Sequence, residues 1–441
     1  MFSSHSFFTT GKHNSIGVYL VIFILTVFFT NLRQNVVTNN QCEICSDKAG
    51  YYMYLPATFH WGFGTSHYEE SFEEQHGYGF KIDRENDIVI TKFTSGVAIL
   101  LSPFYGLGTI IDRVFSLGNH PYSRFYLFFI NLGSAFYLTL GLYFLRKWLH
   151  NYVDAISSFW TIITLILATN LTYYTLDENL MSHLYSFTLF VLILYSIKRF
   201  YQSSHLKYFI LFSFALALSI LVRPTNILFL PIALFLDIKD FESLKKNLLQ
   251  LISFKTIILG SLILLLVLSP QMVYWKMAYD KYIVWSYSGE GFTLWNRPDF
   301  LITWFSPQSG LIPYVPVFIL SIIFWIVMYR RKAANVWLIL ITFLAISYMC
   351  AAWHNPFFGD CNFGKRPMVE YYPVLFLPIA FMFSYYPSFS IQIQKILIGS
   401  LMIFSYYHLT LFGVFDTCFY GEVWEWDTFG ALVKKAIVLI R

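Results

Sequence analysis

Long apolar segments separated by short polar stretches recur along most of this 441-residue chain. The apolar segments are about 17 to 25 residues long, enough for a helix to cross roughly 30 Å of hydrocarbon. A transmembrane barrel would instead show short strands of alternating polarity. We therefore predict an all-α polytopic membrane protein, a bundle of about 11 transmembrane helices. The predicted spans are residues 16–31, 124–145, 154–174, 181–197, 206–222, 225–238, 254–270, 311–329, 335–352, 370–387 and 394–413.

One further apolar run, Thr94 to Ile111, is nearly long enough to span, but Pro103, Gly106 and Gly108 interrupt it. Short cytoplasmic loops are enriched in Lys and Arg, so the basic clusters decide its placement. If the run does not cross, every cluster lies on the cytoplasmic side, and if it crosses, every cluster is exported. We therefore predict a re-entrant or juxtamembrane helix, an internal N-terminus and an external C-terminus. The clusters are Arg146-Lys147, Lys198-Arg199, Lys239 with Lys245-Lys246, Arg330-Arg331-Lys332, and Lys395.

The composition agrees with a membrane protein. Hydrophobic residues make up 57% and charged residues 12% of the chain, whereas a soluble domain carries roughly 25% charged residues. The net charge of +5 does not indicate nucleic-acid binding, because Lys and Arg lie mainly in the clusters between spans. We expect one membrane domain, residues 1–441, with external segments at 31–123, 271–310 and 414–441. The first span is interpreted as an uncleaved signal-anchor, with a cleaved signal peptide as the alternative.

The first external segment is too polar to cross a membrane and too aromatic for a disordered linker. We expect short helices on the membrane surface here, with Tyr51, Tyr52, Tyr54 and Trp61 at headgroup level.

Cysteines are few, five in all, and four of them fall in predicted external segments. Pairing of Cys42 with Cys45, or of Cys361 with Cys418, would give a structural disulfide if the compartment is oxidising. A zinc site would need two more ligands at a suitable spacing, so we predict no metal site.

Several polar groups next to apolar runs fall on one side of the predicted membrane. Asp47 follows the first span closely, in a position that would suit a catalytic acid or a helix N-cap. Asp177 and Glu178 lie at a turn between two spans, where Asn179 and His183 would share a helix face. The alternative for this turn is a polar connection with a satisfied buried histidine.

Two basic groups lie on the same side. Pro224 biases Arg223 away from continued helix, so the break presents a guanidinium that would bind phosphate or extend to the headgroups. An external loop that enters a span carries His354, Lys365 and Arg366. Positive charge there runs against the cytoplasmic bias of Lys and Arg, which favours anion binding over an ordinary solvated loop. Polar groups from such distant parts of the chain predict a shared cavity.

Common nucleotide and metal motifs are absent. The sequence has no Walker A loop, Rossmann glycine motif, zincin motif or nucleophile elbow, and the external loops have no Asp-x-Asp pair. A donor whose leaving group is a lipid phosphate fits the basic residues better than a metal-bound nucleotide sugar.

The stretch Asp47-Lys-Ala-Gly-Tyr-Tyr-Met-Tyr-Leu-Pro resembles the Asp-Glu-x-x-Tyr segment of two branches of the GT-C superfamily of membrane glycosyltransferases. These branches are the protein mannosyltransferases and the lipid A aminoarabinose transferases. Residues 91–105 resemble their juxtamembrane segment, and residues 363–373 are similar to a run in bacterial members. The resemblance implies a GT-C-like fold, a polyprenyl-phosphate-linked sugar donor and a catalytic acid in the first external loop. Lys48 departs from the pattern, because an acid often stands at that position.

The combined hypothesis is an inverting glycosyltransferase of a bacterial inner membrane, with its active site on the periplasmic face. The predicted partners are a polyprenyl-phosphate sugar, a glycan, lipid or protein acceptor, and membrane lipid, without nucleic acid; no cofactor is required and a divalent metal is optional. A transporter or flippase of lipid-linked glycans and a non-catalytic assembly subunit are the alternatives. The predicted catalytic residues are Asp47, Asp177 and Glu178, and the predicted substrate-binding residues are Lys48, Tyr51, Tyr52, His183, Arg223, His354, Lys365 and Arg366.

Overall fold

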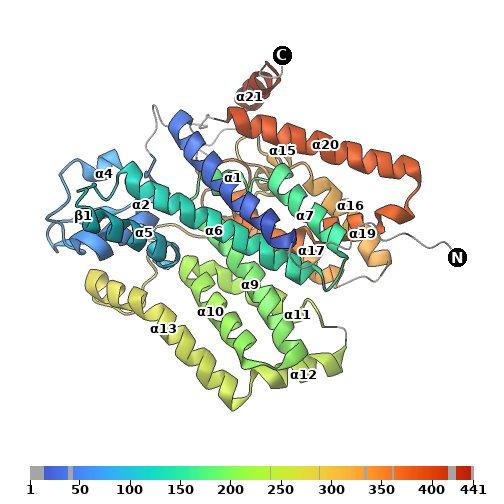
Figure 1. The fold of residues 1–441 in the computed structure, drawn as a ribbon, viewed down its shortest axis with the longest axis horizontal. Helices are drawn as coiled ribbons and strands as arrows, with labels where there is room; N and C mark the ends of the chain where they lie inside the picture. The colour runs from blue at the N-terminus through green and yellow to red at the C-terminus, as the bar shows by residue number, and fades with distance from the viewer. Residues whose placement is uncertain are drawn as a thin grey trace.

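The computed structural model describes residues 14–37, 43–238, 240–287, 289–331, 335–359, 362–415 and 424–438. The chain forms a helical bundle in which long helices cross the molecule and short ones connect them (Figure 1). The described residues include one antiparallel pair of short strands, β1 (Lys81–Asp83) and β2 (Ile88–Ile90), with Ile82 opposite Val89. The predicted all-α fold class is confirmed.

Six of the described helices are long and apolar enough to cross a membrane. A seventh span would combine four short helices that bend by 41° at one break. The six are α1 (Asn14–Val37), α5 (Gly96–Val114), α6 (Arg124–Leu149), α9 (Ser182–Ser203), α13 (Phe254–Tyr279) and α20 (Ile391–Val414), and the bent span comprises η3 (Arg366–Tyr371), α18 (Tyr372–Leu375), α19 (Leu377–Tyr385) and η4 (Tyr386–Ser388).

Shorter apolar helices occupy the other predicted spans. They are α7 (Ala155–Ala168), α10 (Leu206–Val222), η2 (Pro224–Phe229) with α11 (Leu230–Phe235), α16 (Phe318–Arg330) and α17 (Val336–Ala352). Helices therefore coincide with all eleven predicted spans, and the crossing of the shorter ones stays a prediction. Helix α9 lies at the centre, since 78% of its apolar stretch is buried, against 17% for α1 and α13.

Helix α5 is continuous, so the expected interruption by Pro103 and two glycines is wrong. Pro103 lacks the amide that would bond the carbonyl of Ile99, and Ser102 Oγ donates to this carbonyl instead, at 2.8 Å. Glycine serves close packing here, because a Cβ on Gly108 would lie 2.7 Å from the ring of Phe129. Since α5 is long and apolar enough to span, its predicted re-entrant or juxtamembrane placement stays a prediction.

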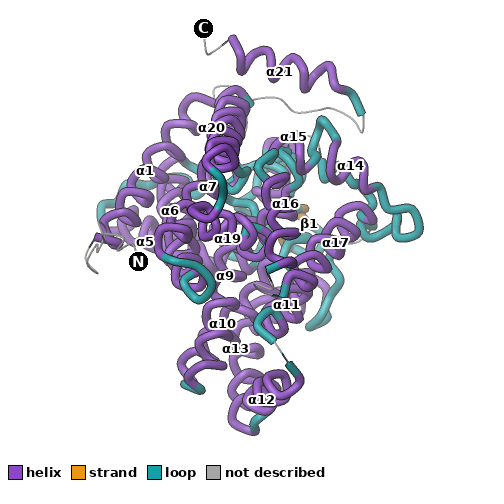
Figure 2. Tube along the Cα trace, turned by 90° about the vertical axis from the view of Figure 1, so that its right-hand side faces the viewer, coloured by secondary structure: helices purple, strands orange, loops and turns teal. Residues whose placement is uncertain are grey.

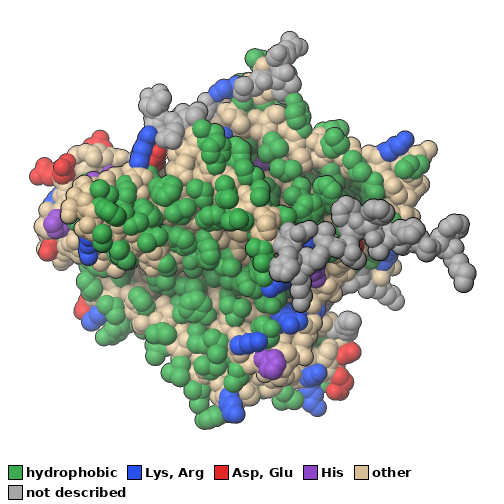
Figure 3. All heavy atoms as spheres, in the orientation of Figure 1, with side chains coloured by type: hydrophobic (Ala, Val, Ile, Leu, Met, Phe, Trp, Pro, Cys, Tyr) green, Lys and Arg blue, Asp and Glu red, His purple; other side chains and the backbone are tan. Residues whose placement is uncertain are grey.

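The basic ends of α6 and α9 lie together. Asp237, just after α11, accepts a hydrogen bond from the Tyr152 hydroxyl at 2.6 Å and contacts Lys198 Nζ at 2.8 Å. Helices α6 and α9 therefore run in the same direction, as their predicted topology requires. On the face shown in Figure 3, hydrophobic side chains cover the middle, acidic ones gather near α4 (Phe72–Gln75) and β1, and Lys and Arg lie around the rim.

The tyrosines of the first external segment are buried in protein, so their expected placement at headgroup level is wrong. Tyr51, Tyr52 and Tyr54 are 3%, 0% and 4% exposed. The Tyr52 hydroxyl donates to the carbonyl of Pro121 at 2.5 Å, and that of Tyr54 to Phe93 at 2.8 Å. These bonds satisfy the hydroxyls and allow burial. The predicted short helices are present as α2 (Asp47–Tyr52), α3 (Tyr54–Pro56), η1 (Ala57–Trp61) and α4.

Two amphipathic helices were not predicted. Helix α12 (Phe241–Leu251) and helix α21 (Trp426–Val438) lie at opposite ends of the molecule (Figure 2). No residue of α12 is buried, whereas α21 buries Phe429 and Leu432 and packs beside α20. The remaining short helices are α8 (Tyr173–Leu176), α14 (Phe300–Phe305) and α15 (Leu311–Tyr314).

Candidate active site

Asp47 is the first residue of α2, and its carboxylate contacts a cation from the last third of the chain. Arg366 Nη2 lies 3.1 Å from Asp47 Oδ2, and the two side chains are 21% and 31% exposed. Ser46 stands at the N-cap position of α2 and makes no side-chain hydrogen bond to the helix. Helix α2 is held close to the neighbouring backbone, because a Cβ on Gly50 would lie 2.3 Å from the carbonyl oxygen of Gly79.

Two further acid–base pairs join the turn before α9 to the first external segment and α1. Lys48 Nζ lies 3.0 Å from Glu178 Oε1. Arg33 Nε and Nη2 donate to the two carboxylate oxygens of Asp177, both at 2.6 Å, and the guanidinium lies 4.0 Å from the centre of the Phe412 ring. Burial raises the pKa of Asp177, and Arg33 opposes that rise. Both oxygens of this predicted catalytic acid are thus engaged by Arg33.

A network of amides fixes the same end of the bundle. Asn131 Nδ2 of α6 donates to Asn31 Oδ1 at 3.0 Å and to Gln34 Oε1 at 2.7 Å, both on α1. Asn179 Nδ2 donates to Asn131 Oδ1 at 2.6 Å. The network ties α1 and α6 to the turn that carries Asp177 and Glu178.

Another charged cluster contains two buried side chains, His183 and Glu370, and the partly exposed Arg223. His183 Nδ1 lies 2.9 Å from Glu370 Oε1, and Arg223 Nη1 donates to the same oxygen at 2.6 Å. Tyr51 connects this cluster with Asp47: Arg223, Asp47 and Arg366 are all near enough to affect its pKa, which burial raises. The structure thus brings Asp47, Tyr51, His183, Arg223 and Arg366 together, as the sequence predicts.

Three predicted binding residues are placed differently. Tyr52 belongs to the core, as described above. Lys365 is 0% exposed; its Nζ donates to the Pro356 carbonyl at 2.6 Å and lies 3.3 Å from Ser309 Oγ, and burial lowers its pKa to about 8. His354 is held by its backbone amide, which donates to the Gly291 carbonyl at 2.8 Å. No contact within the described residues links His354 or Lys365 directly to Asp47.

Some residues at the site escaped the sequence-based prediction. Arg33 carried a signal, since a basic residue at the external end of the first span runs against the positive-inside rule. Tyr287 carried none: it lies on the loop after α13, near enough to Tyr51, Arg223 and Asp47 for them to affect its pKa, which burial raises. The ion pair of Lys92 with Glu290, at 2.5 Å, attaches this loop to the first external segment.

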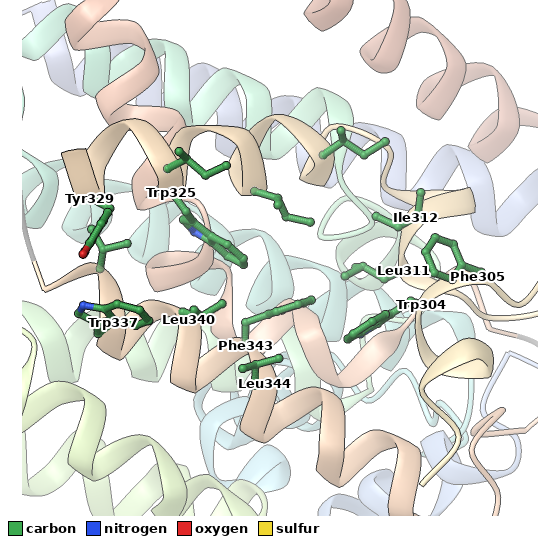
Figure 4. Close-up of a pocket in the computed structure, with 14 residues that line it drawn as sticks. Trp304, Phe305, Leu311, Ile312, Trp325, Tyr329, Trp337, Leu340, Phe343 and Leu344 are labelled. Carbon is green, nitrogen blue, oxygen red and sulfur yellow. The ribbon is translucent and has the colours of Figure 1, made fainter. Parts of the chain in front are cut away.

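An apolar groove of about 680 Å³ lies between α16 and α17. Tyr329 and Trp337 form one end, and Trp304, Phe305 and Ile312 form the other (Figure 4). The second end adjoins the turn between α14 and α15, which includes Ser309, the partner of Lys365. The groove therefore runs along the bundle towards Lys365, the residue before Arg366.

The His, Cys, Asp and Glu side chains are the candidate metal ligands, and the cysteines can also form disulfides. No group of three or more His, Cys, Asp or Glu side chains that could hold a metal ion occurs among the described residues. Cys45 is disulfide-bonded and Cys350 is a buried free thiol. The disulfides suggested by the sequence, Cys42–Cys45 and Cys361–Cys418, involve residues outside the described part of the chain.

The chain is similar in structure to solved oligosaccharyltransferases. No protein-family model and no curated protein sequence matches the chain. The archaeal oligosaccharyltransferase AglB from Archaeoglobus fulgidus, in complex with an inhibitory peptide and a dolichol-phosphate, matches 96% of the chain with a TM-score of 0.50 and 10% identity. The apo oligosaccharyltransferase from Archaeoglobus fulgidus matches 95% of it with a TM-score of 0.50 and 11% identity. The chain has a GT-C-type fold.

The GT-C fold implied by the resemblance of short motifs is therefore confirmed across nearly the whole chain. The chain spans 56% of the length of each of these oligosaccharyltransferase chains. In this GT-C fold, the cluster around Asp47 lies where the first external segment, the start of α9 and η3 meet.

Proposed function

We propose that this protein is an inverting glycosyltransferase that moves a sugar from a polyprenyl-phosphate-linked donor to a glycan, lipid or protein acceptor. The observation that carries the proposal is the contact between Asp47 and Arg366, an acid and a cation that meet at one end of a GT-C-type bundle. One solved relative of the same fold is a complex with a dolichol-phosphate and a peptide, which agrees with a lipid-phosphate donor.

The chemistry requires a base and an anion-binding group. In the proposed reaction Asp47 takes the proton from an acceptor hydroxyl, whose oxygen bonds to the anomeric carbon. The bond from that carbon to the donor phosphate oxygen breaks, and its electron pair leaves with the polyprenyl phosphate. Arg366 and Arg223 stabilise the leaving phosphate, because guanidinium groups donate two parallel hydrogen bonds to phosphate. Arg366 contacts Oδ2 of Asp47, so in this scheme the other carboxylate oxygen takes the proton.

We assign the lipid chain of the donor to the apolar groove between α16 and α17. Its lining is aromatic and aliphatic, which suits an isoprenoid chain. Its end at Trp304 and Phe305 lies beside the loop that positions Arg366, so the chain and the phosphate would lie in continuous contact with the protein.

The proposed location rests on the sequence, and the proposed roles of Asp177 and Glu178 rest on their ion pairs. The proposed location is a bacterial inner membrane with the site on the periplasmic face, because the basic clusters then lie on the cytoplasmic side. Asp177 and Glu178 are assigned to positioning, since Arg33 and Lys48 engage them. A divalent metal is optional in this scheme, because the cations named above can balance the phosphate.

The test uses the purified full-length protein in nanodiscs with a panel of radiolabelled polyprenyl-phosphate sugars. Asp47→Asn is compared with Asp83→Asn, which changes a half-buried acid of the β1–β2 hairpin that accepts a hydrogen bond from Asn86. A general base contributes about 10²- to 10⁴-fold, so Asp47→Asn should lose turnover by that factor while Asp83→Asn keeps it. Full turnover in Asp47→Asn would remove Asp47 from the mechanism. In proteoliposomes, transport of the lipid-linked sugar across the membrane without sugar transfer would identify a flippase instead.

A further inference from the structure

Glu370 is a carboxylate in an unusual place. It lies inside the 3₁₀ helix η3, its side chain is 3% exposed, and apolar residues surround it in the sequence. Burying a carboxylate is unfavourable unless charged or hydrogen-bonding partners compensate for the lost water. Its partners therefore explain why this position can carry an acid.

Both partners of Glu370 come from other helices and meet the same oxygen. Arg223 Nη1 donates to Oε1 at 2.6 Å, and His183 Nδ1 lies 2.9 Å from it. Arg223 stands at the break between α10 and η2 with extended backbone angles, φ −151° and ψ 123°, and Pro224 follows it. This conformation ends α10 at Val222 and begins η2.

The ion pair leaves most of the guanidinium free to act on a ligand. Arginine carries five N–H donors, and its hydrogen bond to Glu370 uses one nitrogen, Nη1. No other hydrogen bond joins the Arg223 side chain to a described residue. The Arg223 side chain is 22% exposed, compared with 3% for Glu370. The buried Glu370 thus holds the partly exposed Arg223 in position at the site.

Helix η3 connects this pair to the proposed base. Arg366, its first residue, contacts Asp47, and Glu370, near its end, holds Arg223. A single short helix therefore sets the position of one arginine directly and of the other through an ion pair.

We propose that Glu370 is a positioning residue that orients the Arg223 guanidinium for the donor phosphate, an inference that rests on the proposed function. Buried ion pairs add little net stability compared with apolar residues of the same size, but they fix geometry. The His183 ring holds the same carboxylate oxygen from the other side, so Glu370 cannot turn away without losing two partners.

The experiment measures binding of undecaprenyl phosphate to the full-length protein in nanodiscs by intrinsic fluorescence, without any sugar. The variants are Glu370→Gln, Arg223→Gln and the double variant, with Glu370→Asp as a variant that keeps the charge. Asp237→Asn is the matched control, since it removes an ion-paired carboxylate at the other end of the bundle. Folding of each variant is checked by monodisperse gel filtration.

If Glu370 acts through Arg223, Glu370→Gln and Arg223→Gln each weaken binding by about tenfold, and the double variant is no weaker than Arg223→Gln. Residues that act independently would instead give losses that multiply. Glu370→Asp should recover part of the affinity, and Asp237→Asn should bind as the wild type does. If Glu370→Gln does not fold, the same comparison is made with Glu370→Asp alone and combined with Arg223→Gln.

Two outcomes separate the inference from the function on which it rests. Wild-type binding by Glu370→Gln together with weak binding by Arg223→Gln would overturn the positioning role and leave the phosphate site intact. Wild-type binding by Arg223→Gln would overturn the phosphate site itself, and the positioning role with it. Losses that multiply in the double variant would assign Glu370 to general structural support.

Discussion

Replacing Asp177 by Asn tests whether this acid supports the site or takes part in the reaction. Arg33 engages both of its oxygens at 2.6 Å, and the Arg33 and Asp177 side chains are 17% and 15% exposed. Breaking a fully buried ion pair costs about 3–5 kcal/mol, whereas an exposed pair contributes about 0.2–1 kcal/mol. For a pair that is mostly but not fully buried, we expect Asp177→Asn to lower stability by about 2 kcal/mol.

Arg33→Met should cost somewhat more, because it also removes the cation that lies 4.0 Å from the Phe412 ring centre. The double variant should be more stable than the sum of the single effects predicts, since neither charge is then left unpaired. The assay is thermal unfolding in detergent, followed by gel filtration of the remaining monodisperse protein, with turnover measured on the folded fraction. Asp237→Asn, which breaks the Lys198 pair of similar burial, serves as the control.

The turnover results decide between the two roles. If Asp177 supports the site without taking part in the reaction, folded Asp177→Asn keeps most of its turnover, and the double variant recovers stability. A variant with wild-type thermal stability that loses turnover by more than about 100-fold would show that Asp177 is a catalytic acid. In that case the double variant would stay inactive, because removing Arg33 cannot replace the carboxylate.

Further predictions concern the groove, a buried lysine and a helix contact. Leu340→Trp should fill the groove and raise KM severalfold for a long-chain donor. The KM for a donor with three isoprene units should stay unchanged. An equal rise in KM for both donors would argue against the groove as the lipid site. Burial lowers the pKa of Lys365 from 10.5 to about 8. Between about pH 8 and pH 10.5 the unfolded state therefore binds more protons than the folded state. The free energy of unfolding of the wild type should rise with pH in this range, by up to about 3 kcal/mol. Lys365→Met should lack this rise in thermal unfolding between pH 7 and 9.5, and parallel profiles for the two proteins would contradict the pKa. Gly96→Ala should destabilise the protein, because the added Cβ would lie 2.3 Å from the backbone nitrogen of Val222, whereas Gly399→Ala, which meets nothing within 4 Å, should unfold like the wild type.

The positions and relative directions of the helices could be predicted from the sequence because they depend on local properties. The lengths of apolar runs predict the helices, and the basic clusters predict which ends lie together. The contacts of Asp237 with Lys198 and Tyr152 agree with that placement. The same logic predicts that Asp47 and Arg366 share a side, although 318 residues separate them in the chain.

The pairing of charges could not be predicted, because it depends on distances of a few ångströms between helix ends. From the sequence, Asp177 and Glu178 are candidates for a second catalytic carboxylate. In the folded chain Asp177 forms an ion pair with Arg33, and Glu178 forms one with Lys48. Sequence patterns also place Lys365 with the phosphate-binding groups, whereas its Nζ meets a backbone carbonyl in the interior.

The tyrosines show a second limit of pattern-based prediction. An aromatic run after a span is typical of residues at the membrane interface. Tyr52 and Tyr54 instead reach backbone carbonyls of residues far along the chain, at Pro121 and Phe93. A tyrosine can be buried wherever its hydroxyl finds such an acceptor, and the sequence does not reveal where the acceptors lie.

The charges of the site have a consequence for how a donor phosphate would bind. Each of the four carboxylates of the site, Asp47, Asp177, Glu178 and Glu370, contacts a different Lys or Arg side chain. A phosphate that binds Arg366 must therefore compete with Asp47 for it. Of these four acids, Asp47 is the most exposed, at 31%, and Glu370 the least, at 3%. Water compensates an exposed carboxylate better than a buried one, so the Asp47–Arg366 pair costs least to open. Under the proposed function, the phosphate takes Arg366 and thereby releases Asp47, so that the base becomes available when the donor is bound.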